Sequence, residues 1–101
     1  MDGGIEPREL YERAADFTVF DIRKKPDDRK VPGSVPFDGA ALESGSNVPF
    51  GKDEKVALYC GSGNSCGRIA KTLRDRGYDA VALEGGYKAW IDSGLPTQER
   101  E

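Results

Sequence analysis

The sequence predicts a single α/β domain with a parallel sheet, because short apolar runs alternate along the chain with segments of helical periodicity. The length of 101 residues is that of one domain, and no internal repeat or low-complexity segment divides it. The most apolar run, 55–60, is followed at once by glycines. Since ligand sites in such sheets lie at the carboxyl ends of strands, this turn is the first place to look for a site.

The first half of the chain predicts one clear helix and one clear strand. A helix is expected over 7–15, since Pro7 suits a first helical position and Leu10 begins an apolar stripe. The run 17–22 is rich in aromatic and β-branched residues, which favours a strand. The polar, proline-containing segment 23–36 predicts a loop. Shorter elements are expected beyond it: a strand over 35–37, a helix over 38–44 and a loop over 45–51.

The second half predicts two buried strands, each followed by glycines and a helix. The strands are expected at 55–60 and 80–83, and the helix between them at 65–76, with Gly77 as its C-terminal cap. Three- and four-residue spacing gives this helix an apolar face of Cys66, Ile69, Ala70 and Leu73. A last short helix is expected to turn Tyr87, Ala89 and Trp90 inward and to stop at Gly94 and Pro96.

Composition excludes several classes of function. The net charge of −3 makes nucleic acid an unexpected partner, and no apolar run approaches the length of a membrane span. No signal peptide is visible at the N-terminus, so we expect a cytoplasmic protein whose two cysteines are thiols, acting as a monomer. There is no histidine, which removes the usual base of a cysteine protease. Too few ligands are present for a zinc site, and no cofactor or other metal is expected.

The loop 60–65 has the features of an anion cradle. Its small residues allow several backbone N–H groups to point inward, and the following helix N-terminus adds positive potential. Both effects favour a thiolate, so the pKa of Cys60 is expected to lie below that of a free thiol. On position alone, an equally good interpretation is that Cys60 simply ends a buried strand.

Four stretches resemble the rhodanese domains. The loop 59–65 opens with a cysteine and has glycine at the fourth place, like the active loop of that family. The stretch 20–23 resembles the family's Asp-x-Arg, and 83–96 resembles its C-terminal signature. The stretch 31–36 is similar to the His-x-Pro-Gly-Ala segment, with Lys30 where histidine is usual. Together, and in the order in which they occur along the chain, these four stretches form a set that is specific to the family.

The resemblance covers about 5–96 and implies that 1–101 is one rhodanese domain, a three-layer α/β/α fold with a five-stranded parallel sheet. It implies a sulfurtransferase that moves sulfane sulfur from thiosulfate or a persulfide to a thiophilic acceptor through a persulfide on Cys60. The implied partners are a small sulfur donor or acceptor, or a protein that carries a persulfide. Asp21 and Arg23 are expected to support the loop structurally. The residues expected to bind substrate are Gly61, Ser62, Gly63, Asn64, Ser65 and Cys66.

Several residues near the loop allow two interpretations. The loop has Gly61 and Ser65 where family members often carry a basic residue, so the dianion thiosulfate is expected to be a poor donor. Cys66 is either a resolving thiol or a core residue, and its helix face favours the core. Arg68 either points toward the bound anion or is a solvated surface side chain, and we favour the surface. The charged run 23–30 is a solvated loop or, alternatively, a rim where a partner docks or a substrate binds.

Other enzyme classes fit the sequence less well. Cysteine-based phosphatases and arsenate reductases resemble one another in the motif Cys-x5-Arg, whose arginine binds the oxyanion. In this sequence the sixth residue after Cys60 is Cys66, so that arginine is missing. A thioredoxin-like centre would need Cys-x-x-Cys, which is absent from this sequence. The remaining alternative is a rhodanese-like regulatory or sulfur-carrier binding module without turnover of its own. Because inactive members of the family usually lack the cysteine, the presence of Cys60 favours the enzyme.

Overall fold

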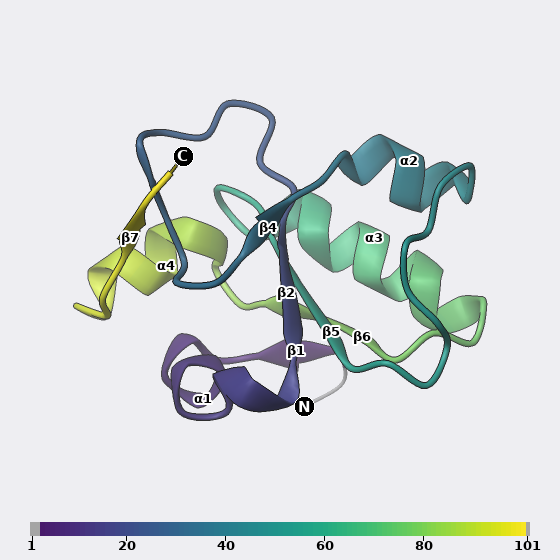
Figure 1. Ribbon diagram of the computed structural model, residues 1–101, viewed down its shortest axis with the longest axis horizontal. Helices are drawn as coiled ribbons and strands as arrows, with labels where there is room; N and C mark the ends of the chain where they lie inside the picture. Colours follow the sequence, from purple (N-terminus) through teal and green to yellow (C-terminus); the bar gives the residue numbers. More distant parts are fainter. Residues whose placement is uncertain (1–2, 101) are drawn as a thin grey trace.

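Five parallel strands form the central sheet, in the spatial order β1-β6-β5-β2-β4 (Figure 1). This computed structural model describes residues 3–100. The three strands in the middle of the sheet have four residues each, and the two edge strands have two. The five-stranded parallel sheet is therefore confirmed. The strands are β1 (Gly4–Ile5), β2 (Thr18–Asp21), β4 (Val35–Pro36), β5 (Val56–Tyr59) and β6 (Ala80–Leu83).

Helices cover both faces of this sheet, which gives three layers. Helices α2 and α3 contact each other and contribute side chains to one core, whereas α1 and α4 contact each other and contribute to a second (Figure 1). Each core lies against one face of the sheet. The three-layer α/β/α prediction is confirmed. The helices are α1 (Pro7–Glu12), α2 (Gly39–Ser44), α3 (Asn64–Asp75) and α4 (Gly86–Asp92), with a 3-10 turn η1 at Ala14–Asp16.

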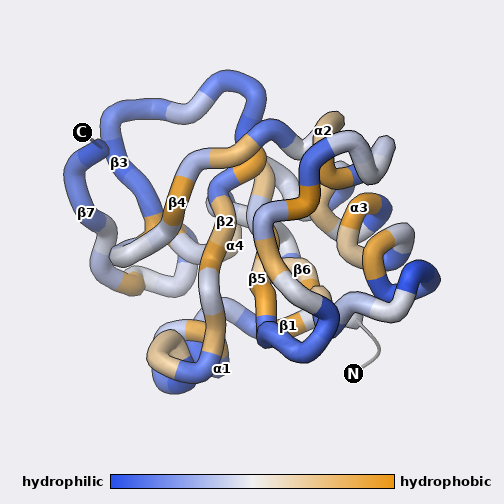
Figure 2. The backbone as a smooth tube through the Cα atoms, turned by 45° about the vertical axis from the view of Figure 1, so that its right-hand side comes forward, coloured by the Kyte–Doolittle hydropathy of each residue, from blue (hydrophilic) through white to orange (hydrophobic). Residues whose placement is uncertain are grey.

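Strand β5 contributes side chains to both cores. Val56 and Leu58 belong to the core beneath α2 and α3, and Ala57 and Tyr59 belong to the core beneath α1 and α4. Successive side chains of a strand point to opposite faces, so a strand covered on both sides must be apolar throughout. All four residues of β5 are buried. Figure 2 shows the hydrophobic segments gathered along the sheet strands and the hydrophilic ones in the outer loops.

The structure differs from the sequence-based expectations mainly in its shortest elements. The first helix ends at Glu12 and the 3-10 turn follows it, so the expected single helix over 7–15 was wrong at its C-terminal end. The expected loop over 23–36 contains β3 (Arg29–Lys30), which pairs antiparallel with β7 (Gln98–Glu99). Strand β1 was not expected either. Two-residue strands are too short to show a period, so no sequence pattern marks them.

The topology brings two loops together at the carboxyl edge of the sheet. Asp21 at the end of β2 is the register partner of Tyr59 at the end of β5, and the Ile22 N–H donates to the Tyr59 carbonyl at 2.9 Å. The segments after β2 and after β5 therefore begin side by side. Within residues 3–100, no helix is long and apolar enough to cross a membrane, and no three metal-ligating side chains are grouped.

Candidate active site

Cys60 follows β5 directly, and its sulfur lies against the backbone at the start of α3. The N–H of Gly63 donates to Cys60 Sγ at 3.1 Å, and the N–H of Cys66 donates to it at 3.4 Å. The loop can curl this tightly because Gly63 has a φ of 96°, in the left-handed region that favours glycine. Cys60 is only 6% exposed. The expected cradle of loop N–H groups therefore exists around this sulfur.

The surroundings of Cys60 make its thiol acidic. Hydrogen bonding from the Cys66 side chain beside it acts with the backbone N–H groups of Cys66, Gly63 and Ser65. These donors outweigh burial, which disfavours charge, and lower the pKa of Cys60 to about 5. At neutral pH the side chain is therefore a thiolate, which is the nucleophilic form of cysteine. No basic side chain is needed to ionise it.

Cys66 has the opposite character. Its side chain is fully buried in the core beneath α2 and α3, together with Ile69 and Leu73. Its Sγ lies 3.5 Å from the Gly63 carbonyl oxygen and 3.8 Å from the Leu83 carbonyl oxygen, which are alternative acceptors for its single S–H proton. The hydrogen bond with Cys60 and burial raise the pKa of Cys66, so it stays protonated. The position thus agrees with the core interpretation, although the backbone N–H of Cys66 belongs to the cradle.

The start of α4 supports the loop from behind. The N–H of Tyr87 donates to the Cys60 carbonyl at 2.8 Å, and the N–H of Lys88 donates to the Gly61 carbonyl at 3.0 Å. Gly86 permits this approach, because a Cβ atom there would lie 2.6 Å from both the Cys60 carbonyl oxygen and the Gly63 nitrogen. Sequence reasoning placed no residue of α4 at the site. The consecutive glycines at 85–86 were the available signal of a close backbone contact.

Asp21 and Arg23 form a buried ion pair beside the loop. The Arg23 Nη2 and Asp21 Oδ2 atoms are 2.7 Å apart, and the two side chains are 5% and 3% exposed. Burial disfavours the Asp21 charge, but the hydrogen bonds and charge of Arg23 prevail and lower the pKa of Asp21. The guanidinium also stacks over the Tyr87 ring at 4.1 Å and donates to the Arg29 carbonyl. These contacts tie Arg23 to β2, β3 and α4, and the structural role expected for Asp21 and Arg23 stays a prediction.

The segment 31–36 packs beneath this pair through Tyr59. The Tyr59 hydroxyl accepts from the Val31 N–H at 3.2 Å and lies 2.9 Å from the Ser34 hydroxyl. Lys30, at the position where histidine is usual in the family, donates through Nζ to the Ser34 carbonyl at 3.0 Å. Lys30 therefore holds the turn and does not face Cys60.

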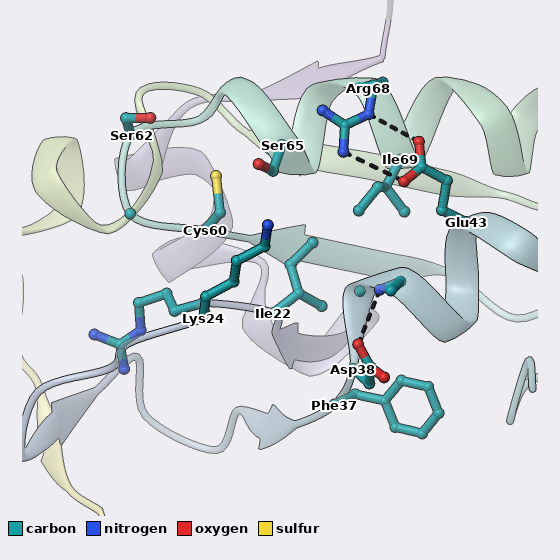
Figure 3. Close-up of a pocket in the computed structure, with 14 residues that line it drawn as sticks. Ile22, Lys24, Phe37, Asp38, Glu43, Cys60, Ser62, Ser65, Arg68 and Ile69 are labelled. Atoms are coloured by element: carbon teal, nitrogen blue, oxygen red, sulfur yellow. Dashed lines mark hydrogen bonds and ion pairs between the residues drawn. The ribbon is translucent and has the colours of Figure 1, made fainter.

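A cavity of about 570 Å³ opens in front of Cys60, between the loops after β2 and β5 and the starts of α2 and α3 (Figure 3). Gly61, Ser62 and Ser65 line it, whereas Gly63 and Asn64 of the same loop do not. The expected substrate loop thus divides into residues that face the cavity and residues that shape the turn. None of those facing it carries a charge.

Charged side chains reach the cavity from other elements. Arg68 lines it but is bound by Glu43 through hydrogen bonds of 2.8 and 3.3 Å, and its side chain is 59% exposed (Figure 3). Arg68 is therefore a paired surface residue rather than a clamp over Cys60. Lys24 also lines the cavity. Sequence reasoning did not identify Glu43, which is far from the loop in sequence, and it named Lys24 only as part of a charged run whose alternative role is a docking or substrate rim.

Comparison with known proteins decides the family. The sequence model of the family described as rhodanese-like domain matches residues 6–93 of this chain. The chain belongs to the rhodanese-like domain family. This rhodanese-like domain is also similar to a rhodanese-related protein of Thermoplasma volcanium, with a TM-score of 0.80, 26% identity, and 94% and 96% of the two chains covered.

Two further proteins are similar to this rhodanese-like domain. A Rhodopseudomonas palustris protein of unknown function, described as a possible tyrosine phosphatase, has a TM-score of 0.75 and 30% identity, with 94% of this chain and 83% of that chain covered. An uncharacterized protein of Synechocystis is 40% identical over 53 residues, which are 52% of this chain and 30% of that protein. The matched segment thus spans less than a third of that curated relative.

Proposed function

We propose that this rhodanese-like domain is a sulfurtransferase and that Cys60 carries the sulfur as a persulfide. The observation that carries the proposal is the thiolate of Cys60, held by the N–H groups of Gly63 and Cys66 at the inner end of a cavity. A thiolate attacks the sulfane sulfur of a donor, and the donor's remaining group leaves with the electron pair of the broken bond. An acceptor thiolate then removes the outer sulfur and regenerates Cys60.

The cradle suits the intermediate as well as the free thiolate. A persulfide places its charge one atom farther from the cysteine, in the direction of the cavity. The neutral side chains of Ser62 and Ser65 line that part of the site and can solvate one negative charge. Both reacting sulfurs therefore keep hydrogen-bond donors nearby throughout the cycle, without a reorganisation of charged side chains.

Phosphate-ester chemistry is a weaker candidate for this site. A cysteine-based phosphatase holds a phosphoryl dianion with an arginine at the sixth position after the cysteine, and here that position is the buried Cys66. Arg68, the arginine of α3 that lines the cavity, is already bound by Glu43. The site therefore lacks an unpaired arginine in α3 that could bind a phosphoryl dianion.

Turnover distinguishes an enzyme from a regulatory or carrier module. Sulfide release from an organic persulfide in the presence of excess thiol is measured for the wild type, Cys60→Ser and Cys66→Ser. We expect multiple turnovers for the wild type, none above background for Cys60→Ser, and most of the activity for Cys66→Ser, because Cys66 packs in the core. A wild type that accepts one sulfur per chain but does not turn over would support the carrier alternative. A reducing compartment such as the cytoplasm fits a site whose nucleophile is a free thiol.

A further inference from the structure

Among the described residues that line the cavity, Lys24 is the one cation that forms no ion pair. It lies just after β2, and in Figure 3 it extends across the cavity toward the side that holds Cys60 and Ser65. Across residues 3–100, its ammonium group has no ion-pair partner. A lysine that points into a cavity next to a nucleophile, without a carboxylate of its own, is available to bind an anionic substrate group.

The other cations that line the cavity are paired, Arg23 with the Asp21 carboxylate and Arg68 with Glu43. Glu43 is bound by Arg68, and hydrogen bonding from Arg68 lowers the pKa of Glu43. Asp38 begins α2 and accepts from the Ala40 N–H at 3.0 Å, so one of its oxygens caps that helix. Within the described lining, Lys24 is therefore the cation left to pair with a ligand, and Asp38, which keeps its negative charge, disfavours a second anionic group on that ligand.

The floor of the cavity is apolar. Ile22, which directly follows β2, and Ile69 of α3 line it, and both are buried from solvent. Gly39 at the start of α2 closes the floor, because a Cβ atom there would lie 3.1 Å from Ile69 Cδ1 and 3.4 Å from Ile22 Cβ. An inorganic anion has no apolar surface to place against such a floor. A substrate with a short carbon chain would bury that chain there.

We propose that Lys24 selects a low-molecular-weight organic persulfide that carries a carboxylate. The carboxylate pairs with the Lys24 ammonium, the carbon chain lies over Ile22 and Ile69, and the outer sulfur reaches Cys60. This inference rests on the proposed sulfur transfer. In the loading step, Cys60–S⁻ attacks the outer sulfur of R–S–SH, the bond between the two donor sulfurs breaks, and R–S⁻ leaves with its electron pair. Cys60–S–SH is formed, and no oxidant or reductant is consumed.

The arrangement also explains why thiosulfate should be the poorer donor. Thiosulfate carries two negative charges, and one ammonium group together with neutral loop residues compensates only part of the cost of removing a dianion from water. It also leaves Ile22 and Ile69 uncovered. The reacting form of the carboxylate persulfide is the protonated R–S–SH, whose single negative charge pairs with Lys24 and whose carbon chain covers the apolar floor.

A matched pair of donors tests the role of the carboxylate. The persulfides of 3-mercaptopropionate and 3-mercapto-1-propanol have the same chain length but differ in charge. We measure kcat/KM for loading of Cys60 in the wild type, Lys24→Gln, Lys24→Arg and Lys25→Gln. The wild type is expected to prefer the carboxylate donor by roughly three- to fivefold, which is the effect of one ion pair formed by an exposed lysine. Lys24→Gln is expected to reduce the preference to near one, whereas Lys24→Arg and Lys25→Gln keep it.

Three other outcomes of these loading experiments would each contradict one part of the proposal. A preference that survives in Lys24→Gln, or that disappears equally in Lys25→Gln, would overturn the role of Lys24. Loading by thiosulfate as efficient as that by the carboxylate persulfide would overturn the organic substrate class. If no donor places sulfur on Cys60 of the folded wild type, the proposed function itself fails, and the inference falls with it.

Discussion

Gly86 provides a sharp test of how the loop at Cys60 is held in place. Replacing it by alanine adds a single methyl group to α4, outside the loop itself. That Cβ atom would lie 2.6 Å from the Cys60 carbonyl oxygen, 2.6 Å from the Gly63 nitrogen and 2.8 Å from the Gly61 carbonyl oxygen. All three are backbone atoms of the cradle, so the clash cannot be relieved by rotating a side chain. The loop must move away from α4.

The cost has two parts. Gly86 has a φ of 64°, and a residue with a side chain in the left-handed region costs roughly 1–2 kcal/mol. Overpacking a closely packed site adds roughly 1–3 kcal/mol. Gly86→Ala should therefore lower the free energy of unfolding by about 2–5 kcal/mol. Gly94→Ala is a matched control, since Gly94 has a φ of 72° but a Cβ atom there would meet nothing within 4 Å.

Urea unfolding gives both free energies, and the alkylation rate of Cys60 as a function of pH reports on the cradle. We expect Gly86→Ala to be clearly less stable than Gly94→Ala and to have a higher Cys60 pKa, because the Gly63 N–H is displaced from the sulfur. Gly94→Ala should leave the Cys60 pKa unchanged. Equal stability losses in the two variants, with an unshifted Cys60 in both, would refute the view that contact with α4 positions the loop.

Two further predictions concern the charges at the site. Alkylation of Cys60 by a neutral reagent should titrate near pH 5, well below the value of about 8.5 for a free thiol. Since folding lowers the pKa of Cys60, the Cys60 thiolate stabilises the fold above about pH 8.5, and this contribution is lost as the pH falls toward 5. Cys60→Ser should therefore flatten the pH dependence of the free energy of unfolding between these two values. A wild-type Cys60 that titrates at about pH 8.5 would contradict this prediction. Asp21→Asn should cost about 3–5 kcal/mol, because it leaves the buried Arg23 charge without its main partner. Asp27→Asn removes an exposed contact of the same guanidinium and should cost less than about 1 kcal/mol in the same unfolding experiment, so similar losses would argue against the buried pair.

The parts of the fold that could be predicted from sequence are those with a long enough pattern. The apolar run ending at Tyr59 and the helix face of Cys66, Ile69 and Leu73 both lie where their periodicity indicates. The two-residue strands β1, β3 and β7 show no period, and their pairing is decided by tertiary contacts. Their absence from the prediction follows from their length.

The candidate site was predictable in part for the same reason. The loop from Cys60 to Ser65 is continuous in sequence, so its glycines and its place between strand and helix were enough to identify it. Glu43 reaches the cavity from α2, and Lys24 reaches it from the segment after β2. Their position depends on how α2 packs against α3 and on the pairing of β2 with β5, which the sequence does not display.

The most direct test of the central claim is the intact mass of the folded protein after brief exposure to an excess of 3-mercaptopropionate persulfide. The account predicts that the wild type gains the mass of one sulfur atom, that fragmentation places it on Cys60, and that a thiol acceptor removes it. Cys66→Ser should gain the same mass, and Cys60→Ser should gain none. Sulfur found on Cys66, or an equal gain in Cys60→Ser, would contradict the claim that Cys60 carries the transferred sulfur.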